Sequence, residues 1–126
     1  MAWKKRAGMP SAARETIEVD ATGKVVGRLA SEIAGWLMGK HRASYIPHID
    51  AGAIVKVKNA RGLVFTGKKL ESKVHFRSSN RPSGIKRVRV AELMQTRPDE
   101  VLRHAVKYML PKNRTQSVRL KRLLFV

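Results

Sequence analysis

The feature that most constrains the fold of this 126-residue chain is a change in the spacing of its apolar residues. Residues 16–20 (TIEVD) alternate apolar and polar side chains, which is typical of a half-buried strand. From residue 25 the apolar residues recur every three or four positions, which predicts an amphipathic helix that ends at a left-handed Gly39. Residues 53–60 (AIVKVKNA) alternate again. The order strand, helix, strand predicts an α/β domain.

The remainder of the chain predicts further short elements. Strands are expected at residues 63–66 and 73–77, and residues 78–84 (SSNRPSG) are expected to form a loop. Helix is expected again from about Val90. Residues 96–99 (TRPD) resemble a capping box in which Asp99 replaces the usual Glu, and the apolar stripe behind them ends at Pro111.

The last segment, residues 113–126, is compatible with a third helix that packs through its apolar side. The elements together predict a three-layer α/β/α single domain over residues 15–126, with a small, mainly parallel sheet flanked by helices. Residues 1–14 carry four cations and no acid, so we interpret them as a flexible basic arm that precedes the domain.

Positive charge dominates the composition of the chain. It has 27 Lys and Arg against 9 Asp and Glu, a net charge of +18. Residues 51–90 contain eleven of these cations and only one acid, Glu71. Such clustering predicts a binding face for a polyanion, and nucleic acid is the commonest one. An anionic membrane surface is the weaker alternative, because two Trp and three Phe provide few bulky apolar anchors.

Several other classes of protein are disfavoured by the composition. Cysteine is absent, which excludes disulfides, a zinc ribbon and a thiol nucleophile and is typical of a reducing compartment. The longest uncharged runs fall far short of the roughly 20 residues that a membrane-spanning helix needs. The basic arm shares the Ala- and Arg-rich, acid-free composition of organelle transit peptides, but it is short and no clear cleavage signature follows it.

Residues 39–50 (GKHRASYIPHID) suggest three kinds of site: metal, phosphate or nucleic acid. His48 and Asp50 could form a two-histidine, one-carboxylate iron site with His75 or His104, although four histidines produce such patterns by chance. A phosphate loop at residues 35–40 would be one residue short and at the wrong end of its helix.

A dinucleotide fold is a further possibility, because glycines join the first strand to the helix. This connection contains only two glycines, Gly23 and Gly27, so the complete G-x-G-x-x-G fingerprint is missing. No nucleophile, base and orienting group assemble from the sequence, so we expect neither an enzyme nor a cofactor.

Several short motifs then occur in a distinctive order: DATGK at 20–24, GRLAS at 27–31, GKH at 39–41, Y-x-PH-x-D at 45–50, NA at 59–60, TGKK at 66–69 and AVK-x-MLPKN at 105–113. In order and spacing, the chain resembles family thirteen of the large-subunit ribosomal proteins, in its bacterial or organellar form, from about residue 18 to residue 113. The pair GKH and Y-x-PH-x-D, together with MLPKN, is far more specific than any single motif.

The resemblance implies an α/β/α domain that binds large-subunit (23S-type) rRNA, acts early in subunit assembly beside neighbouring ribosomal proteins, and has no catalytic role. It also implies a place in the ribosome, cytoplasmic rather than organellar. The alternative is a free RNA-binding regulator, for example of messenger RNA, that uses the same basic face. The residues that the family motifs mark for rRNA contact are Lys40, His41, Tyr45, His48, Lys68, Lys69, Lys112 and Asn113. Asp20, Gly23, Gly27 and Gly39 are expected to shape the fold.

The charge pattern adds further candidates for RNA binding, namely Lys4, Lys5, Arg6, Arg42, Arg77, Arg81, Lys86, Arg87, Arg114 and Arg119. In the loop after Gly39, Pro47 favours an extended backbone that leads into the next strand. Tyr45 and His48 either stack on bases or pack on the domain, and the sequence does not choose between these. Asp50 is expected to accept hydrogen bonds in a turn or cap.

Two stretches depart from the family pattern. Residues 77–84 (RSSNRPSG) keep the final glycine of the family's usual His-Ser-Gly-Tyr-x-Gly-Gly stretch but lack its histidine and aromatic character. Residues 114–116 (RTQ) replace the usual Leu-Gly-Arg, and the family's Tyr-x-Gly and His-Pro-His tail is not found before Val126. Contacts that the family makes through these segments are therefore not carried over.

Overall fold

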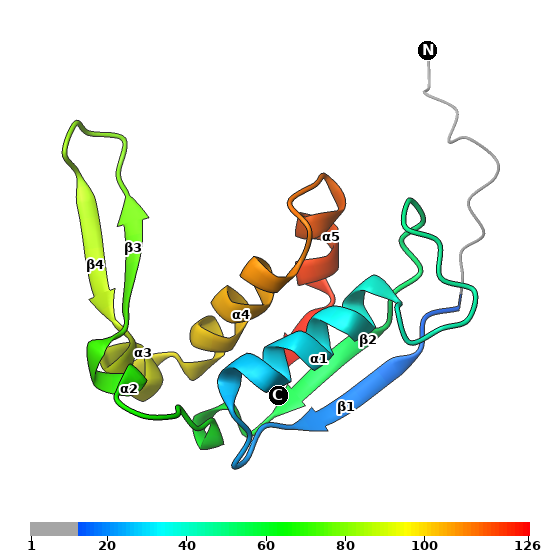
Figure 1. Ribbon diagram of the computed structural model, residues 1–126, viewed down its shortest axis with the longest axis horizontal. Helices are drawn as coiled ribbons and strands as arrows, with labels where there is room; N and C mark the ends of the chain where they lie inside the picture. The colour runs from blue at the N-terminus through cyan, green and yellow to red at the C-terminus, as the bar shows by residue number, and fades with distance from the viewer. Residues whose placement is uncertain (1–12) are drawn as a thin grey trace.

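The computed structural model describes residues 13–126, and Figure 1 shows the path of the chain. The described elements are, in order, β1 (Thr16–Asp20), α1 (Val26–Met38), β2 (Ile54–Lys58), the 3-10 helix η1 (Ala60–Gly62), α2 (Lys69–Ser72), β3 (Val74–Ser78), β4 (Ile85–Arg89), α3 (Val90–Thr96), α4 (Pro98–Met109), α5 (Thr115–Lys121) and β5 (Leu123–Phe125). The predicted strand at 16–20, the helix before Gly39 and the strand within 53–60 are thereby confirmed.

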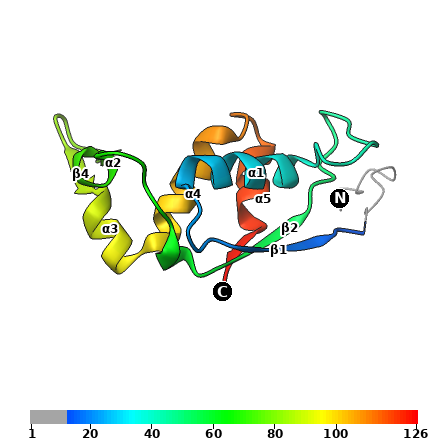
Figure 2. The ribbon, with the colours of Figure 1, turned by 60° about the horizontal axis from the view of Figure 1, so that its bottom comes forward.

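The central sheet has the strand order β1-β2-β5, and both pairs of strands are parallel. Val19, Val55 and Val57 are buried, whereas Glu18 and Lys58, on the opposite face, are exposed. Figure 2 shows α1, α4 and α5 above the sheet, with its other face open. The α/β class and the small, mainly parallel sheet are confirmed, and the described helices that pack on this sheet do so on one face only.

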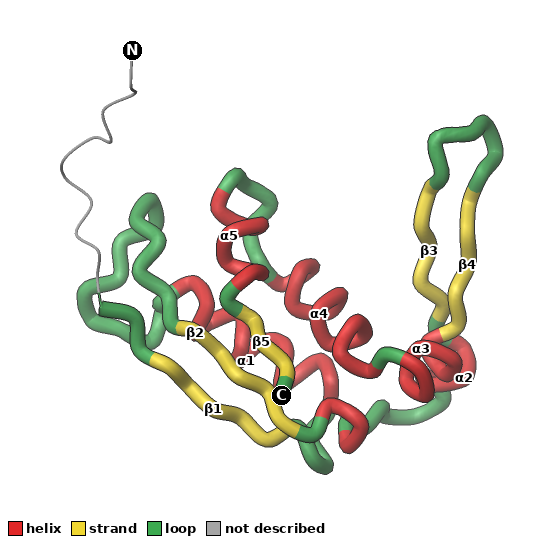
Figure 3. Tube along the Cα trace, turned by 180° about the vertical axis from the view of Figure 1, so that it is seen from behind, coloured by secondary structure: helices red, strands yellow, loops and turns green. Residues whose placement is uncertain are grey.

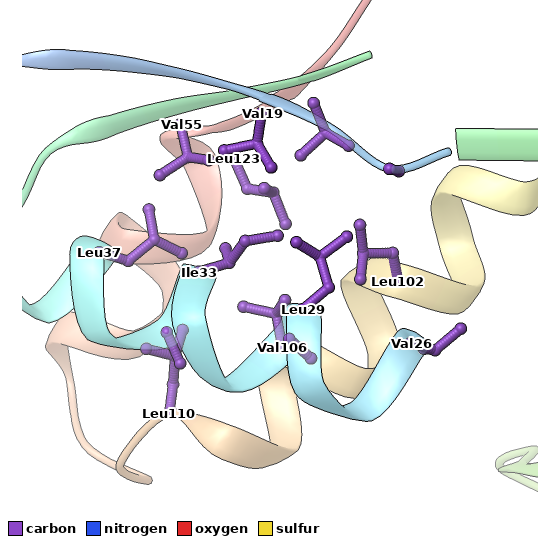
Figure 4. Packing of buried hydrophobic residues seen from close by; sticks show 14 of the residues in the cluster. Val19, Val26, Leu29, Ile33, Leu37, Val55, Leu102, Val106, Leu110 and Leu123 are labelled. Carbon is purple, nitrogen blue, oxygen red and sulfur yellow. The ribbon is translucent and has the colours of Figure 1, made fainter. Parts of the chain in front are cut away.

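The hydrophobic core lies between this sheet and the helices. Leu29, Ile33 and Leu37 of α1 point toward the strands, and Leu102 and Val106 of α4 approach from the side (Figure 4). All five side chains are almost completely buried. Each such burial stabilises the fold by about 1.5–3 kcal/mol before the entropy cost of ordering the chain.

The end of α1 is set by Gly39, which adopts the predicted left-handed conformation at a φ of 85°. Its N–H lies 3.1 Å from the carbonyl oxygen of Gly35, which closes the last turn. Glycine takes this conformation without the steric penalty of a Cβ atom. Trp36, just before this end, is half-buried against the core.

Two predicted local structures are wrong. Residues 63–66 form no strand, because only Val64 pairs, in a single bridge to Val25. The capping box is also absent: Thr96 is the last residue of α3, and its hydroxyl donates to the carbonyl of Glu92 instead. A threonine inside a helix commonly bonds the carbonyl four residues earlier. Arg97 then occupies the N-cap position of α4.

Two strands were not predicted from the sequence. β4 pairs antiparallel with β3, and its five residues are all exposed, so no buried face produces a recognisable pattern. β5 has only three residues and follows directly after α5. Only its parallel pairing with β2 makes this segment a strand. The expected third helix therefore covers residues 115–121 and not the whole C-terminal segment.

Candidate nucleic-acid interface

The β3–β4 hairpin is the most prominent basic element of the molecule. It projects away from the central sheet and helices in Figures 1 and 3. The predicted loop at 78–84 connects its strands, and the N–H of Ser79 lies 2.6 Å from the carbonyl oxygen of Gly84. A Cβ atom at position 84 would lie 1.9 Å from the hydroxyl oxygen of Ser79, so a larger residue there would force the Ser79 side chain to move.

The hairpin presents no negative charge to the solvent, and both cations and apolar side chains are exposed on it. Residues 74–89 contain no acid, and the exposed cations are Arg77, Arg81, Lys86, Arg87 and Arg89. Phe76 is 64% exposed, with the guanidinium carbon of Arg87 5.7 Å from the centre of its ring. A two-stranded hairpin with both faces open to water is marginally stable by itself. Cations beside an exposed aromatic ring suit an RNA partner.

A second basic loop connects α4 to α5. Lys112 and Arg114 are exposed there, as expected. Asn113 has a structural role that was not predicted: its Oδ1 accepts hydrogen bonds from the backbone N–H and the hydroxyl of Thr115, at 3.1 and 2.6 Å. These bonds satisfy a donor at the start of α5.

The loop that follows Gly39 is the third basic segment. Lys40 and His48 are exposed, whereas Tyr45 is half-buried. Two side chains of this loop face Glu15: the Nε2 atom of His41 is 3.5 Å from its carboxylate, and the Nη2 atom of Arg42 is 3.7 Å away. The charge of Arg42 is therefore partly offset within the protein.

These three segments project toward the same side of the molecule. Figures 1 and 2 show the hairpin, the α4–α5 loop and the tip of the loop after Gly39 at the top of both views, and the last of these also contacts Arg14 and Glu15 just before β1. Lys68 and Lys69 are exposed at the start of α2, which precedes β3. The remaining candidates Lys4, Lys5 and Arg6 lie outside the described residues.

The opposite face of the sheet has a different charge character. The carboxylate of Glu18 lies 2.6 Å from Nζ of Lys58 on the neighbouring strand, and this hydrogen bond and charge lower the pKa of Glu18. Asp20 accepts hydrogen bonds from Thr22 and Asn59, and the backbone bond from Thr22 is the main cause of its lowered pKa. Its predicted role in shaping the fold is confirmed.

Asp50 has a larger role than the expected turn or cap. Its carboxylate forms a two-pronged ion pair with Arg122, with Oδ1 at 2.7 Å from Nη2, and lies 3.5 Å from Arg14 and 3.6 Å from Arg119. Arg122 also donates to the carbonyl of Leu37 in the last turn of α1, at 2.8 Å. Burial alone would raise the pKa of Asp50, but the hydrogen bonds and charge of Arg122, with Arg14 and Arg119, lower it overall.

This cluster corrects one predicted RNA contact. Arg119 was expected to bind RNA, but it is only 2% exposed. α5 places this side chain inward, toward Asp50, so it is not available at the surface. Gly52 allows the close packing here, since a Cβ atom at that position would come within 1.7 Å of the carbonyl oxygen of Leu37.

The hypothetical iron site does not form. Asp50 is engaged by arginines, while His75 and His104 lie in another part of the molecule with their rings stacked at 3.8 Å. Within residues 13–126, no three His, Cys, Asp or Glu side chains come close enough to hold a metal ion. Every helix in this range is too short or too polar to cross a lipid bilayer.

Comparison with known proteins agrees with the motif order. A family model described as "Ribosomal protein L13" matches residues 14–125. The chain is 52% identical to the large ribosomal subunit protein uL13 of Caldanaerobacter subterraneus subsp. tengcongensis, over 87% of this chain and 77% of that protein. It is 48% identical to uL13 of Thermotoga maritima over 87% of this chain and 74% of the relative. It is 50% identical to uL13 of Syntrophus aciditrophicus, over 80% of this chain and 71% of that protein.

Proposed function

This chain belongs to the ribosomal protein L13 family, and on that premise we propose that it is a structural component of the large ribosomal subunit that binds 23S-type rRNA. It acts early in subunit assembly, contacts neighbouring ribosomal proteins and resides in ribosomes of the cytoplasm. Its role is architectural and needs neither a catalytic group nor a cofactor.

The observation that carries this proposal is the basic side of the molecule formed by the hairpin and the two basic loops. Duplex and single-stranded RNA both carry closely spaced phosphates, whose counterions are released when Lys and Arg replace them. The acid-free hairpin offers such cations along two strands, together with the exposed ring of Phe76. The residues proposed to contact rRNA are Lys40, His41, Arg42, Tyr45, His48, Lys68, Lys69, Arg77, Arg81, Lys86, Arg87, Lys112, Asn113 and Arg114, together with Lys4, Lys5 and Arg6 of the basic arm.

Co-sedimentation with large subunits at stringent salt tests the proposal directly. With purified large-subunit rRNA, the logarithm of the affinity should fall with the logarithm of salt at a slope of about −4 to −7, at about 0.7–0.9 for each of six to eight phosphate contacts. Recovery of the native protein only in ribosome-free fractions would contradict it. If that fraction still held bound RNA, the chain would instead be a free RNA-binding regulator.

A pair of matched variants locates the binding side. Arg77→Ala with Lys86→Ala removes two cations that face each other across the hairpin. The salt slope should become shallower by about 1.4–1.8, since two phosphate contacts are lost. Lys56→Ala with Lys58→Ala removes two cations from the open face of the sheet and should leave the slope unchanged. Equal effects in both variants would show that binding does not depend on the hairpin side.

A further inference from the structure

We propose that a groove between α1 and α4 binds one unstacked nucleotide of the rRNA, with its base on Tyr108 and its phosphate at the basic rim. This inference rests on the proposed function and adds a specific subsite to it. Nucleotides that are bulged or single-stranded expose a base face, whereas those in a duplex do not. The groove therefore predicts a contact that distinguishes unpaired RNA from paired RNA.

The shape of the groove suits a nucleotide. Its volume is about 690 Å³, and it lies between the start of α1, residues 64–66 and the last turns of α4. Val26, Phe65, Ala105 and Met109 give it apolar walls. Ligand sites of this type commonly combine apolar walls with a few polar groups and have volumes of about 300–1,000 Å³.

The charge around the groove selects an anion. Arg28, Lys69 and Lys73 line it, and none of its described lining residues is acidic. The N-terminal end of α1 also faces the groove through Val26 and Gly27, and the positive end of a helix dipole favours a phosphate. An anion with an apolar, planar part satisfies both the rim and the walls, and a nucleotide has this composition.

Aromatic rings provide the stacking surface. The rings of His75 and His104 stack with their centres 3.8 Å apart, and the ring of Tyr108 lies 4.7 Å beyond His104. Tyr108 is the outermost ring and is 67% exposed. The row of rings thus begins at β3 of the hairpin and ends at the groove, where the exposed Tyr108 can accept a base. It joins the proposed nucleotide subsite to the hairpin that contacts phosphates.

The test compares two variants of the full chain on two RNAs. The probes are a 12-nucleotide single strand of mixed sequence and the same strand annealed to its complement. Tyr108→Leu should weaken binding to the single strand by about 5- to 100-fold, the usual effect of losing one base–aromatic stack. It should leave duplex binding and both salt slopes unchanged. Tyr108→Phe keeps the ring and should bind the single strand within about twofold of the original chain.

Photocrosslinking of the original chain to the single strand provides a measurement that does not depend on how the variants fold. A nucleotide adduct on the peptide that contains Tyr108 is expected. Two results would overturn the nucleotide subsite. One is an unchanged affinity of Tyr108→Leu for the single strand. The other is a crosslink, in assembled subunits, between Tyr108 and a neighbouring ribosomal protein. Binding of free AMP in the groove at micromolar concentration without RNA would also overturn it, because the occupant would then be a soluble nucleotide.

The failure of this inference differs from the failure of the proposed function. If Tyr108→Leu has no effect while Arg77→Ala with Lys86→Ala still reduces the salt slope, rRNA binding stands and only the subsite is lost. If the original chain binds neither these two probes nor purified large-subunit rRNA, the proposed function fails and the subsite fails with it.

Discussion

At the scale of single residues, Asp50 holds together segments that are far apart in the sequence. Its side chain is 18% exposed, and the carboxylate contacts arginines at positions 14, 119 and 122. Arg122 extends the connection to the last turn of α1 through the carbonyl of Leu37. Helix-terminal carbonyls need such external donors, because no intrahelical N–H reaches them. One carboxylate thus fixes the loop before β2 to α1 and to the start of β5.

We expect Asp50→Asn to lower the free energy of unfolding by about 2–4 kcal/mol, because the buried Arg119 and Arg122 would lose the carboxylate that they contact. Urea titration of both proteins measures this difference. Glu32→Gln removes one charge from the exposed side of α1 and should change stability by no more than about 0.5 kcal/mol. An Asp50→Asn protein as stable as this control would show that the cluster contributes little.

At the scale of secondary-structure elements, the hairpin meets the body of the protein through two histidine rings. His75 of β3 stacks on His104 of α4. Burial is the main cause that lowers the pKa of both rings, and Lys73 opposes the protonation of each. His75 and Lys107 add further repulsion at His104. The contact therefore favours two neutral rings.

A pH dependence of stability follows from this stack. Because the pKa values are lowered in the folded protein, the unfolded chain binds more protons as the pH falls below about 6.5, the ordinary pKa of histidine. The free energy of unfolding should therefore decrease between pH 7.5 and 5.5, as measured by urea titration at each pH. A double variant with His75→Phe and His104→Phe should show a flatter profile over the same range. Identical profiles would exclude the stack as the cause.

At the scale of the whole molecule, the basic segments lie far apart along the longest axis but face one side. In Figure 1 the hairpin is at one end and the loop after Gly39 is near the other. An RNA partner that contacts both must therefore extend across the helices. The acids Glu18 and Asp20 lie on the sheet, where they pair or cap locally and do not offset this charge.

Removing cations from the far loop tests whether RNA spans this distance. Lys40→Ala with Arg42→Ala should make the salt slope for rRNA binding shallower by about one, and not two, because Arg42 already faces Glu15. Adding Glu15→Gln to a chain that keeps both cations should instead strengthen binding, since His41 and Arg42 lose their internal partner. An unchanged slope in the Lys40 and Arg42 variant would remove this loop from the interface.

The sequence by itself determined the features that depend on neighbouring residues. The alternation at residues 16–20, the helical spacing before Gly39 and the left-handed glycine each involve residues that are close in the sequence. Local backbone and side-chain preferences therefore predict them. The accumulation of cations in residues 51–90 can be counted from the sequence directly. The ordered motifs then identified the family.

Only the tertiary structure decided the features that depend on distant residues. Arg119 was predicted at the surface, but the ion pair with Asp50, far away in the sequence, draws it inward. β5 becomes a strand because β2 offers it a parallel edge, and Tyr108 meets the groove because α4 packs beside α1. Contacts across such separations depend on how the elements pack in three dimensions, and no local pattern in the sequence encodes that packing.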